Sequence, residues 1–339
     1  MKFSRSKKIL FANNKGGVGK TTLAFNCAVS FAQRGYKTVL VDLDPQCNLS
    51  RLALGDNLYD RTLFSDAEKD VYDVLRGVVE GGSDIDTKVP FIPVEEGDGN
   101  LSLLKGSINL SLYENILVSA YGQAASGQRL GYFQTSAIDR FLREKGLSEE
   151  IDIFVIDTSP SLSLLNQIIF LGSDYFVVPM MPDAFSVQGI ENLGSVFEKW
   201  KQNWKVTGKA LSGETENKFV LSGDGLFIGY IVNSYNVYGK IPIKDHRRWM
   251  VEIPEKVKYY LSEKHCRNGL VERSWRDPLA SIQDYGRIPA KCQELGKAIF
   301  DLDPASIDET HQGTIENIEK SKEEFGSLSE RILKILTDY

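Results

Sequence analysis

The sequence predicts an α/β protein with a doubly wound, mostly parallel sheet flanked by helices. Apolar runs of the kind found in buried parallel strands recur along the chain, at residues 8–12, 38–44, 151–157, 175–180 and 225–233. Helical periodicity separates several of these runs, and acidic residues end two of them. Such alternation is typical of a parallel sheet whose strands are joined by helical crossovers.

The first unit of this kind lies near the N-terminus. A glycine-rich turn follows residues 8–12, and apolar side chains then recur at helical spacing through residues 21–34. Gly35 ends that helix, and residues 38–44 form an uninterrupted apolar strand that closes on acidic residues. We therefore expect strand, helix and strand to form a βαβ unit.

The later strands are expected in the same sheet. A helical stretch, residues 161–171, joins the third apolar run to the fourth. Ligands of such sheets bind beyond the carboxyl ends of the strands. The turn after the first strand should therefore meet Asp42, Asp44 and Asp157, which lie at the ends of two strands.

Composition restricts the class of protein further. The formal net charge of −6 argues against a surface coated with basic residues for nucleic acid, although a local basic patch remains compatible with it. No apolar run approaches the roughly 20 residues that a spanning helix needs. The apolar run after the basic N-terminus is too short for a signal peptide. We expect a cytoplasmic protein that does not enter a membrane.

The four cysteines lie far apart in the sequence and form no Cys-x-x-Cys pair. Their spacing indicates neither a disulfide framework nor a zinc site, so buried free thiols and no structural metal are expected.

A phosphate-binding loop stands between the first strand and the first helix. Its residues are Lys15, Gly16, Gly17, Val18, Gly19, Lys20, Thr21 and Thr22. Glycines let successive backbone N–H groups point at phosphate oxygens, and the helix adds its positive end. Lys20 would reach the β- and γ-phosphates of ATP, and the Thr21 hydroxyl would bind Mg²⁺. A chance glycine-rich turn is the alternative, which the flanking strand and helix disfavour.

The loop departs from the usual G-x-x-x-x-G-K-[ST] pattern. Asn14 stands where the first glycine is expected, and Lys15 places a second lysine at the head of the loop.

Two carboxylates complete the expected site. Asp157 is placed to hold the hydration shell of Mg²⁺, and Asp44 is placed to position the attacking water. Each could instead be a helix cap or a turn residue after a strand, and for Asp42 the structural alternative is as strong as the functional one.

These residues resemble a known family. The loop is similar to the deviant Walker A loop of ParA-type partition ATPases and their MinD relatives, and is closest to Soj-like members without an N-terminal helix-turn-helix domain. The two switch regions, the segment after them and the closing stretch also fit, at residues 41–46, 155–162, 178–179 with 186–193, and 279–286.

The resemblance implies a domain organisation. A P-loop ATPase domain would span residues 1–304, and an acidic helical extension would occupy residues 305–339 and pack on the body or on a second subunit. Two insertions unusual for the family are expected, at about 55–135 and 205–224. The first belongs to a long polar segment expected to form helices with mobile connections, and the second reads as a surface loop.

The resemblance also implies roles for single residues. Two subunits of the family enclose two ATP molecules, so Lys15 would cross to the partner's phosphates, and loss of Asp44 would trap the ATP-bound homodimer. Asn233 would contact adenine. A solvated lysine and a turn asparagine are the structural alternatives. Ser159 replaces a proline of the family pattern, which affects the second switch.

The implied function is ATP-dependent partition or positioning of DNA or another cargo, with slow hydrolysis stimulated by a ParB-like partner. Non-specific DNA binding would use a basic excess within residues 241–300 and place the protein on the nucleoid; the candidates are Arg247, Arg248, Arg273 and Arg276. A solvated, ion-paired surface explains that excess equally well. Alternatives within the superfamily are a MinD-like positioning ATPase and a carrier of a metallocluster or other cargo.

Overall fold

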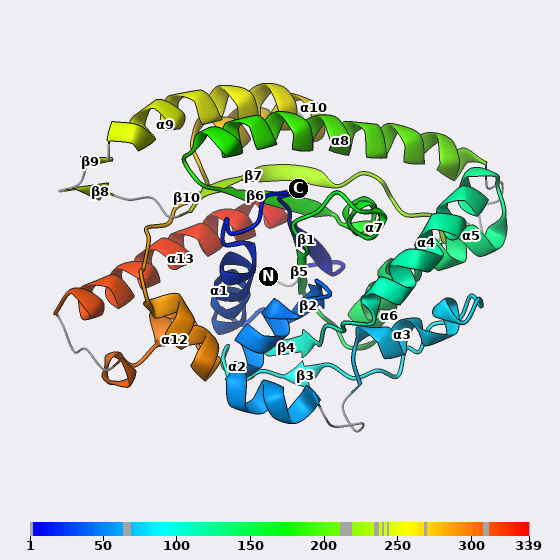
Figure 1. Ribbon diagram of the computed structural model, residues 1–339, viewed down its shortest axis with the longest axis horizontal. Coiled ribbons are helices and arrows are strands. Elements are labelled where there is room, and N and C mark those ends of the chain that lie inside the picture. The colour runs from blue at the N-terminus through cyan, green and yellow to red at the C-terminus, as the bar shows by residue number, and fades with distance from the viewer. Residues whose placement is uncertain are drawn as a thin grey trace.

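The computed structural model describes residues 3–63, 69–210, 219–233, 237–238, 241–242, 244–267, 270–307 and 312–338. An eight-stranded sheet forms the centre of the molecule, in the order β10-β7-β6-β1-β5-β2-β4-β3 (Figure 1). Every pair of neighbours within it is parallel except β3 and β4. The predicted doubly wound fold is therefore confirmed.

The strands of this sheet are β1 (Lys7–Phe11), β2 (Thr38–Leu43), β3 (Ile92–Pro93), β4 (Leu101–Leu104), β5 (Ile153–Thr158), β6 (Tyr175–Met180), β7 (Leu226–Val232) and β10 (Ala280–Ser281). A separate hairpin pairs β8 (Val237–Tyr238) with β9 (Ile241–Pro242). The longer helices are α1 (Lys20–Gln33), α2 (Asn48–Leu63), α3 (Val71–Val79), α4 (Leu110–Ala125), α5 (Arg129–Thr135), α6 (Ala137–Ser148), α7 (Leu164–Gly172), α8 (Ala184–Lys209), α9 (Lys244–Val257), α12 (Ile288–Leu295) and α13 (Gln312–Asp338). Shorter helical segments are η2 (Lys258–Ser262), α10 (Glu263–His265), α11 (Val271–Arg276), η3 (Ile299–Asp301) and η4 (Pro304–Ser306).

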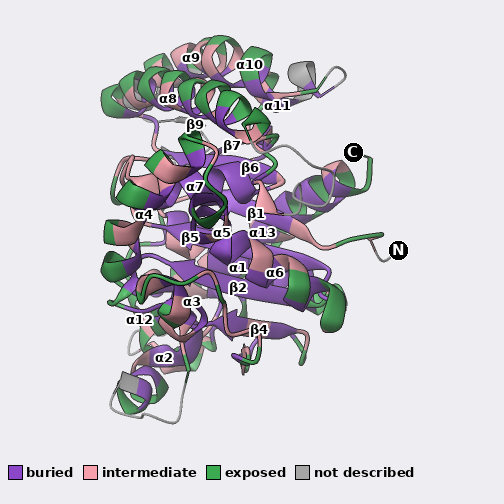
Figure 2. Cartoon of the chain, turned by 90° about the vertical axis from the view of Figure 1, so that its right-hand side faces the viewer, coloured by how far each residue is buried: buried purple, intermediate pink, exposed green. Residues whose placement is uncertain are grey.

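Both faces of the sheet are covered, which explains why its strands read as continuous apolar runs. Side chains alternate between the faces along a strand, so Leu10 joins one core cluster while Ile9 and Phe11 join the other. The first cluster lies under helices α3 to α9, and the second lies under α1, α2, α12 and α13. Figure 2 shows the strands buried and the outer faces of the helices exposed.

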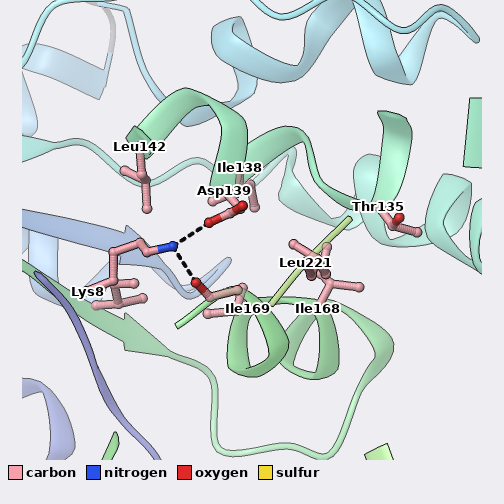
Figure 3. Close-up of a pocket in the computed structure, with 10 residues that line it drawn as sticks. Lys8, Thr135, Ile138, Asp139, Leu142, Ile168, Ile169 and Leu221 are labelled. Carbon is pink, nitrogen blue, oxygen red and sulfur yellow. Dashed lines mark hydrogen bonds and ion pairs between the residues drawn. The ribbon is translucent and has the colours of Figure 1, made fainter. Parts of the chain in front are cut away.

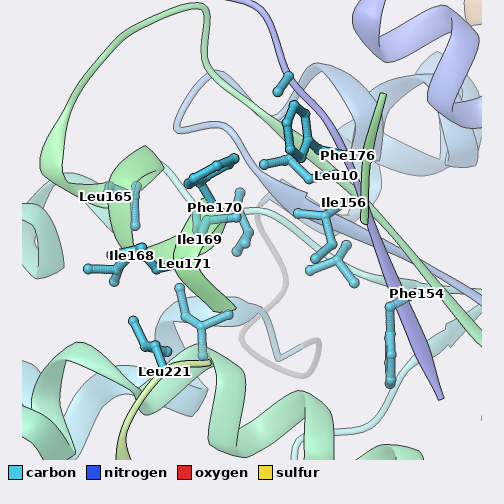
Figure 4. Close-up of a cluster of buried hydrophobic side chains, with 14 of the residues drawn as sticks. Leu10, Phe154, Ile156, Leu165, Ile168, Ile169, Phe170, Leu171, Phe176 and Leu221 are labelled. Atoms are coloured by element: carbon cyan, nitrogen blue, oxygen red, sulfur yellow. The ribbon is translucent and has the colours of Figure 1, made fainter. Parts of the chain in front are cut away.

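One face of the core illustrates the packing. Leu10, Ile156 and Phe176 extend from β1, β5 and β6 toward Ile169 and Phe170 of α7 (Figure 4). Each of these side chains is at most 5% exposed. Burial of this kind contributes about 1.5–3 kcal/mol for each large apolar side chain, so the central strands are fixed in register.

The long polar segment after β2 contains more than the expected helices. It also supplies β4, which pairs in parallel with β2, and β3, which pairs antiparallel with β4 at the edge of the sheet. The expectation of helices with mobile connections therefore missed two strands. Their four and two residues are too short to show a period, so pairing with β2 stabilises them rather than their own sequence.

The surface loop expected at residues 205–224 begins later than predicted. Helix α8 continues to Lys209 because its last turns are held by the core: the Trp204 indole donates to the Leu221 carbonyl at 2.8 Å. The Tyr132 hydroxyl donates to the Thr207 carbonyl at 2.5 Å. These contacts keep residues 205–209 helical although their composition is polar. The middle of the expected loop, residues 211–218, lies outside the described residues.

The acidic C-terminal segment forms α13, which packs on the body beside α1 and β10. Its buried face includes Phe325, Leu328 and Ile332. Within the described part of the chain, no helix combines the length and apolarity required to cross a membrane.

Candidate nucleotide site

The phosphate-binding loop follows the carboxyl end of β1, at the centre of the sheet. Asn13 ties it to the neighbouring strand, since its Nδ2 donates to the Pro179 carbonyl at 2.6 Å and its Oδ1 accepts from the Lys15 N–H at 2.9 Å. Helix α1 begins at Lys20 and has no acidic residue in its first turn. Its positive end is therefore available to an anion.

Two glycines of the loop adopt left-handed backbone, with φ of 74° at Gly17 and 81° at Gly19. Gly19 is further restricted, because a Cβ there would lie 2.1 Å from Nδ2 of Asn233. A side chain at this position would therefore strain the backbone and displace the Asn233 amide.

Thr21 and Asp157, the two residues expected to hold Mg²⁺, lie next to one another in the structure. The Thr21 hydroxyl donates to Oδ2 of Asp157 at 2.7 Å. The other carboxylate oxygen, Oδ1, is buried and accepts no hydrogen bond from any described residue. A buried oxygen without a partner is costly, and a water bound to Mg²⁺ would satisfy it. The donor set therefore fits the expected ion.

Electrostatics around this carboxylate favour a cationic ligand. Burial raises the pKa of Asp157 to about 6, against the Thr21 hydrogen bond and the charge of Lys20. Burial also lowers the pKa of Lys20, while Asp157 and Asp44 act in the opposite direction. Both charged groups are desolvated here, and a nucleotide with its metal would supply compensating charges.

Asp44 and Asp42 have different surroundings although they are two residues apart. Asp44 lines the open cavity next to the loop, and its Oδ1 accepts from the Gln46 N–H at 2.9 Å. Oδ2 of Asp42 accepts from both the N–H and the hydroxyl of Ser50 at 2.7 Å, and the Ser50 hydroxyl accepts from the Gly106 N–H at 2.8 Å. Asp42 thus ties β2 to α2 and to the segment after β4, which favours its structural interpretation.

The cavity beside the loop has a volume of about 440 Å³, within the range of small-molecule sites. Its remaining walls include Pro160, from the segment expected to be the second switch, and residues that sequence reasoning missed, namely Asn48, Leu52, Pro289, Ala290 and Gln293. The last three come from the first turns of α12, far along the chain from the loop. No motif identified them, because the tertiary fold alone brings α12 to this place.

Lys15 lies at the head of the loop but does not line the cavity. Its Nζ is 2.5 Å from Oδ2 of Asp183 and stands over the ring of Phe185 at 5.7 Å. In this structure the second lysine therefore contacts α8 of its own chain.

Asn233 supports the loop from outside the cavity. Its Nδ2 donates to the Val18 carbonyl at 3.0 Å, and its N–H donates to the Met180 carbonyl at 2.8 Å. The structure thus assigns it a contact with the phosphate loop, and its expected contact with adenine stays a prediction.

The loop after β5, expected from the resemblance to be the second switch, is held by a side chain that the sequence did not single out. Nδ2 of Asn166 donates to the carbonyls of Ser159 and Ser161, each at 2.8 Å. The two serine hydroxyls lie 3.0 Å apart. Serine in place of the family's proline therefore adds hydrogen bonds to this loop.

Of the four basic candidates for DNA contact, the structure describes the side chains of two, Arg248 and Arg276. Arg248 is exposed and pairs with Glu252 at 2.9 Å, and Arg276 is exposed beside Trp275. The side chains of Arg247 and Arg273 lie outside the described residues. Other basic residues of this region pair across to α8, as Lys256 does with Glu191 at 3.2 Å. The DNA contact stays a prediction.

A second, small cavity near the start of β1 holds a buried ion pair (Figure 3). Nζ of Lys8 pairs with Asp139 of α6 and donates to the Gly172 carbonyl at 2.5 Å, among apolar side chains. This pair joins β1 to α6 and α7 at the end of the strand remote from the loop. It is a structural pair rather than a ligand site, since each charge is already satisfied.

Cys27, Cys47 and Cys292 are buried as expected, whereas Cys266 is only half-buried. Burial raises the pKa of each of these thiols. In the portion of the chain that the structure describes, no cluster of three His, Cys, Asp or Glu side chains is arranged to bind a metal.

A glycine loop after a central parallel strand, followed by a helix that starts with lysine and threonine beside a strand-end aspartate, defines a P-loop nucleotide-binding protein. The chain belongs to the AAA domain family, whose model matches residues 6–209, and it is a ParA/MinD-type ATPase with a deviant Walker A loop.

Similar proteins are found by sequence and by structure. The virulence plasmid ParA family protein of Chlamydia psittaci is 26% identical over 256 residues, covering 68% of this chain and 88% of that protein. A solved protein from Corynebacterium diphtheriae has a TM-score of 0.73 at 21% identity and covers 97% of this chain and 98% of its own. A variant of Cyanothece McdA solved as an ATP complex has a TM-score of 0.64 at 16% identity, with 97% of each chain covered.

Proposed function

We propose that this chain is an ATP-driven dimerising switch that binds ATP with Mg²⁺, hydrolyses it slowly and thereby partitions or positions DNA or another cargo. The observation that supports this best is the group formed by Lys20, Thr21 and Asp157, with Oδ1 of Asp157 buried and without a partner in the described residues. Such an arrangement suits a metal and phosphates together.

The residues have separate tasks in this proposal. Backbone N–H groups of the loop and the Lys20 ammonium hold the phosphates, while Thr21 and Asp157 hold the metal, the latter through water. Mg²⁺ would neutralise charge on the phosphate oxygens. Asp44, which lines the cavity, orients the attacking water. The first turns of α12 border the cavity and would flank the rest of the nucleotide.

The proposed dimer rests on the family resemblance of the loop. The resemblance implies that Lys15 acts on the nucleotide of a second subunit, as an arginine finger does in trans. Relatives named ParA, such as the protein of Chlamydia psittaci, support the further proposals of non-specific DNA binding, a ParB-like activator and a cytoplasmic, nucleoid-associated location.

Sizing and ATP-binding measurements test the switch. Lys20→Ala should lose ATP binding because the phosphates lose their main cation, whereas Asp44→Ala should keep ATP binding and accumulate a dimer with ATP and Mg²⁺. Wild-type protein with ADP is the control. If Lys20→Ala bound ATP with unchanged affinity, the proposed ATP site would be wrong. If Asp44→Ala stayed monomeric when saturated with ATP, the proposed dimer would be wrong.

Co-sedimentation with DNA tests the proposal that DNA is the cargo. Capture of DNA by the wild-type protein with ATP, but not with ADP or without nucleotide, is the expected result. Equal capture in all three states would separate DNA binding from the nucleotide cycle and favour another cargo.

A further inference from the structure

Lys15 is held by two side chains from the start of α8. Its ammonium lies 2.5 Å from Oδ2 of Asp183 and 5.7 Å from the centroid of the Phe185 ring. The two contacts are of different kinds, an ion pair and a cation–π contact. They direct Lys15 toward its own subunit.

Asp183 is itself fixed in place. It is the N-cap of α8, and its Oδ1 accepts from the Ser186 N–H at 2.8 Å while Oδ2 faces Lys15. The two oxygens therefore have separate partners. An acceptor with a fixed orientation holds the lysine at a lower entropic cost than a mobile surface carboxylate does.

Phe185 extends this holding site to the surface. The residue is 73% exposed although the Lys15 ammonium lies over its ring. Asp183 and Phe185 flank Ala184 at the head of α8, so a lysine that leaves for another subunit must break both contacts.

We propose that Asp183 and Phe185 form a holding site for Lys15 that competes with the second subunit's nucleotide, so that Asp183 sets the ATP concentration at which two subunits pair. This rests on the proposed function, because Lys15 must act in trans. Asp183 is a positioning residue, since it would act through Lys15 and does not line the cavity beside the loop.

The exposure of the Lys15–Asp183 ion pair determines how strongly the pair can shift dimerisation. The side chains of Lys15 and Asp183 are 28% and 35% exposed, so water and salt weaken their attraction. Pairs of this type alter an equilibrium by about two- to fivefold. The holding site therefore delays pairing at low ATP and is overcome when ATP saturates both subunits.

Asp183→Asn is the decisive variant, because asparagine caps a helix as well as aspartate but carries no charge. Asp183→Ser, another good cap, guards against a folding defect of the first variant. Glu198→Gln is the matched control, since it removes a half-exposed carboxylate from the same helix, where Glu198 pairs with Lys264 at 2.5 Å and not with Lys15.

Two measurements are made on full-length protein. Analytical ultracentrifugation over a titration of ATP with Mg²⁺ should show both Asp183 variants dimerising at about two- to fivefold lower ATP than wild type and Glu198→Gln. The difference should shrink as KCl is raised from 50 to about 500 mM. Acetylation of Lys15 in nucleotide-free protein, followed by mass spectrometry, should be faster by a similar factor in the Asp183 variants.

The possible results distinguish a failure of the holding site from a failure of the proposed ATP-driven switch. Unchanged or weaker pairing of both Asp183 variants, with a wild-type protein that dimerises on ATP, overturns the holding site alone. A shift that does not depend on salt, or one that Glu198→Gln reproduces, also overturns it. A wild-type protein that binds ATP and stays monomeric overturns the proposed switch and the holding site together.

Discussion

Gly19 and Asn233 show how much single residues restrict the phosphate loop. The amide of Asn233 occupies the space where any side chain at position 19 would begin, and it donates to the carbonyl of Val18. The loop is therefore shaped from two sides, by its own left-handed glycines and by a side chain from the end of β7.

Gly19→Ala should weaken ATP binding more than Gly17→Ala does. Both glycines have positive φ, so each alanine costs about 1–2 kcal/mol of backbone strain. Only the alanine at position 19 meets another atom, at 2.1 Å, whereas a Cβ at position 17 has nothing within 4 Å. Isothermal titration calorimetry with ATP measures the difference.

The double variant Gly19→Ala, Asn233→Ala provides the control for that comparison. Removing the Asn233 amide should restore part of the affinity, since the clash is relieved while the strain remains. Equal losses for the two single glycine variants would contradict the role given to Asn233.

The raised pKa of Asp157 predicts that the stability of the nucleotide-free protein depends on pH. This pKa is about 6 in the folded chain, above its ordinary value of 3.8, so the folded state binds the proton more tightly. The free energy of unfolding should therefore fall as pH rises from about 4 to about 6 and stay lower above it. Asp42, with a pKa raised to about 7 by burial, extends this fall toward neutrality.

Asp157→Asn should remove the first part of that fall. Asparagine cannot ionise and still accepts from the Thr21 hydroxyl, so the variant should be more stable than wild type at pH 8 by about 1–3 kcal/mol. Urea unfolding at pH 4.5 and pH 8 compares the two proteins. An unchanged slope with pH would mean that Asp157 does not titrate in this range, and Mg²⁺-dependent ATP binding should be lost in either case.

Among the helices and strands, α13 is the element whose role is hardest to infer from its composition. Its exposed face is acidic, which suggests a detachable extension, yet Leu328 is fully buried in the cluster that covers α1. The helix therefore completes one face of the core.

Leu328→Ala should lower the free energy of unfolding by about 2–5 kcal/mol, because it leaves a cavity in that cluster. Lys322→Ala on the exposed side of the same helix is the matched control and should change it by less than about 0.5 kcal/mol. Chemical denaturation measures both. A small loss for Leu328→Ala would indicate that α13 is dispensable for the fold.

Sequence patterns predicted the elements with the longest apolar runs most reliably. The βαβ unit of β1, α1 and β2 was expected within about two residues, because a buried strand and a helix of that length each show their period. The strands β3 and β4 and the end of α8 could not be predicted. Pairing with β2 and contacts of Trp204 decide them, and both are tertiary.

Some residues of the candidate nucleotide site could likewise be predicted from the sequence, and others could not. Lys20, Thr21, Asp157 and Asp44 follow from a local motif and from strand ends that meet at one edge of the sheet. The walls from α12 and the Lys15 pair with Asp183 arise from segments more than 150 residues away, as the separation of 168 in that pair shows. No spacing within one segment reports such a contact.

For the molecule as a whole, the distribution of charge decides whether DNA is a partner. The net charge is −6, so DNA binding would require a local basic surface rather than a general attraction. Arg248 and Arg276 are the described candidates, and both are exposed; a charge reversal at Arg248 tests the proposed contact.

Arg248→Glu should weaken ATP-dependent co-sedimentation with DNA severalfold and reduce its dependence on salt. Arg76→Glu is the control, since Arg76 is also exposed and paired with an acidic neighbour but lies on α3. Equal effects of the two reversals would point to net charge alone, and no effect of Arg248→Glu would place the contact elsewhere.

The wall that α12 gives to the nucleotide cavity has a consequence for how the protein acquires its activity. The loop lies within the first 22 residues, whereas Pro289, Ala290 and Gln293 come from the last fifth of the chain. During synthesis the ribosome releases the loop long before that wall exists, so a nascent chain has half a site. A nucleotide that bridges both parts would link the phosphate loop to α12, and ATP would then favour molecules in which both segments are folded.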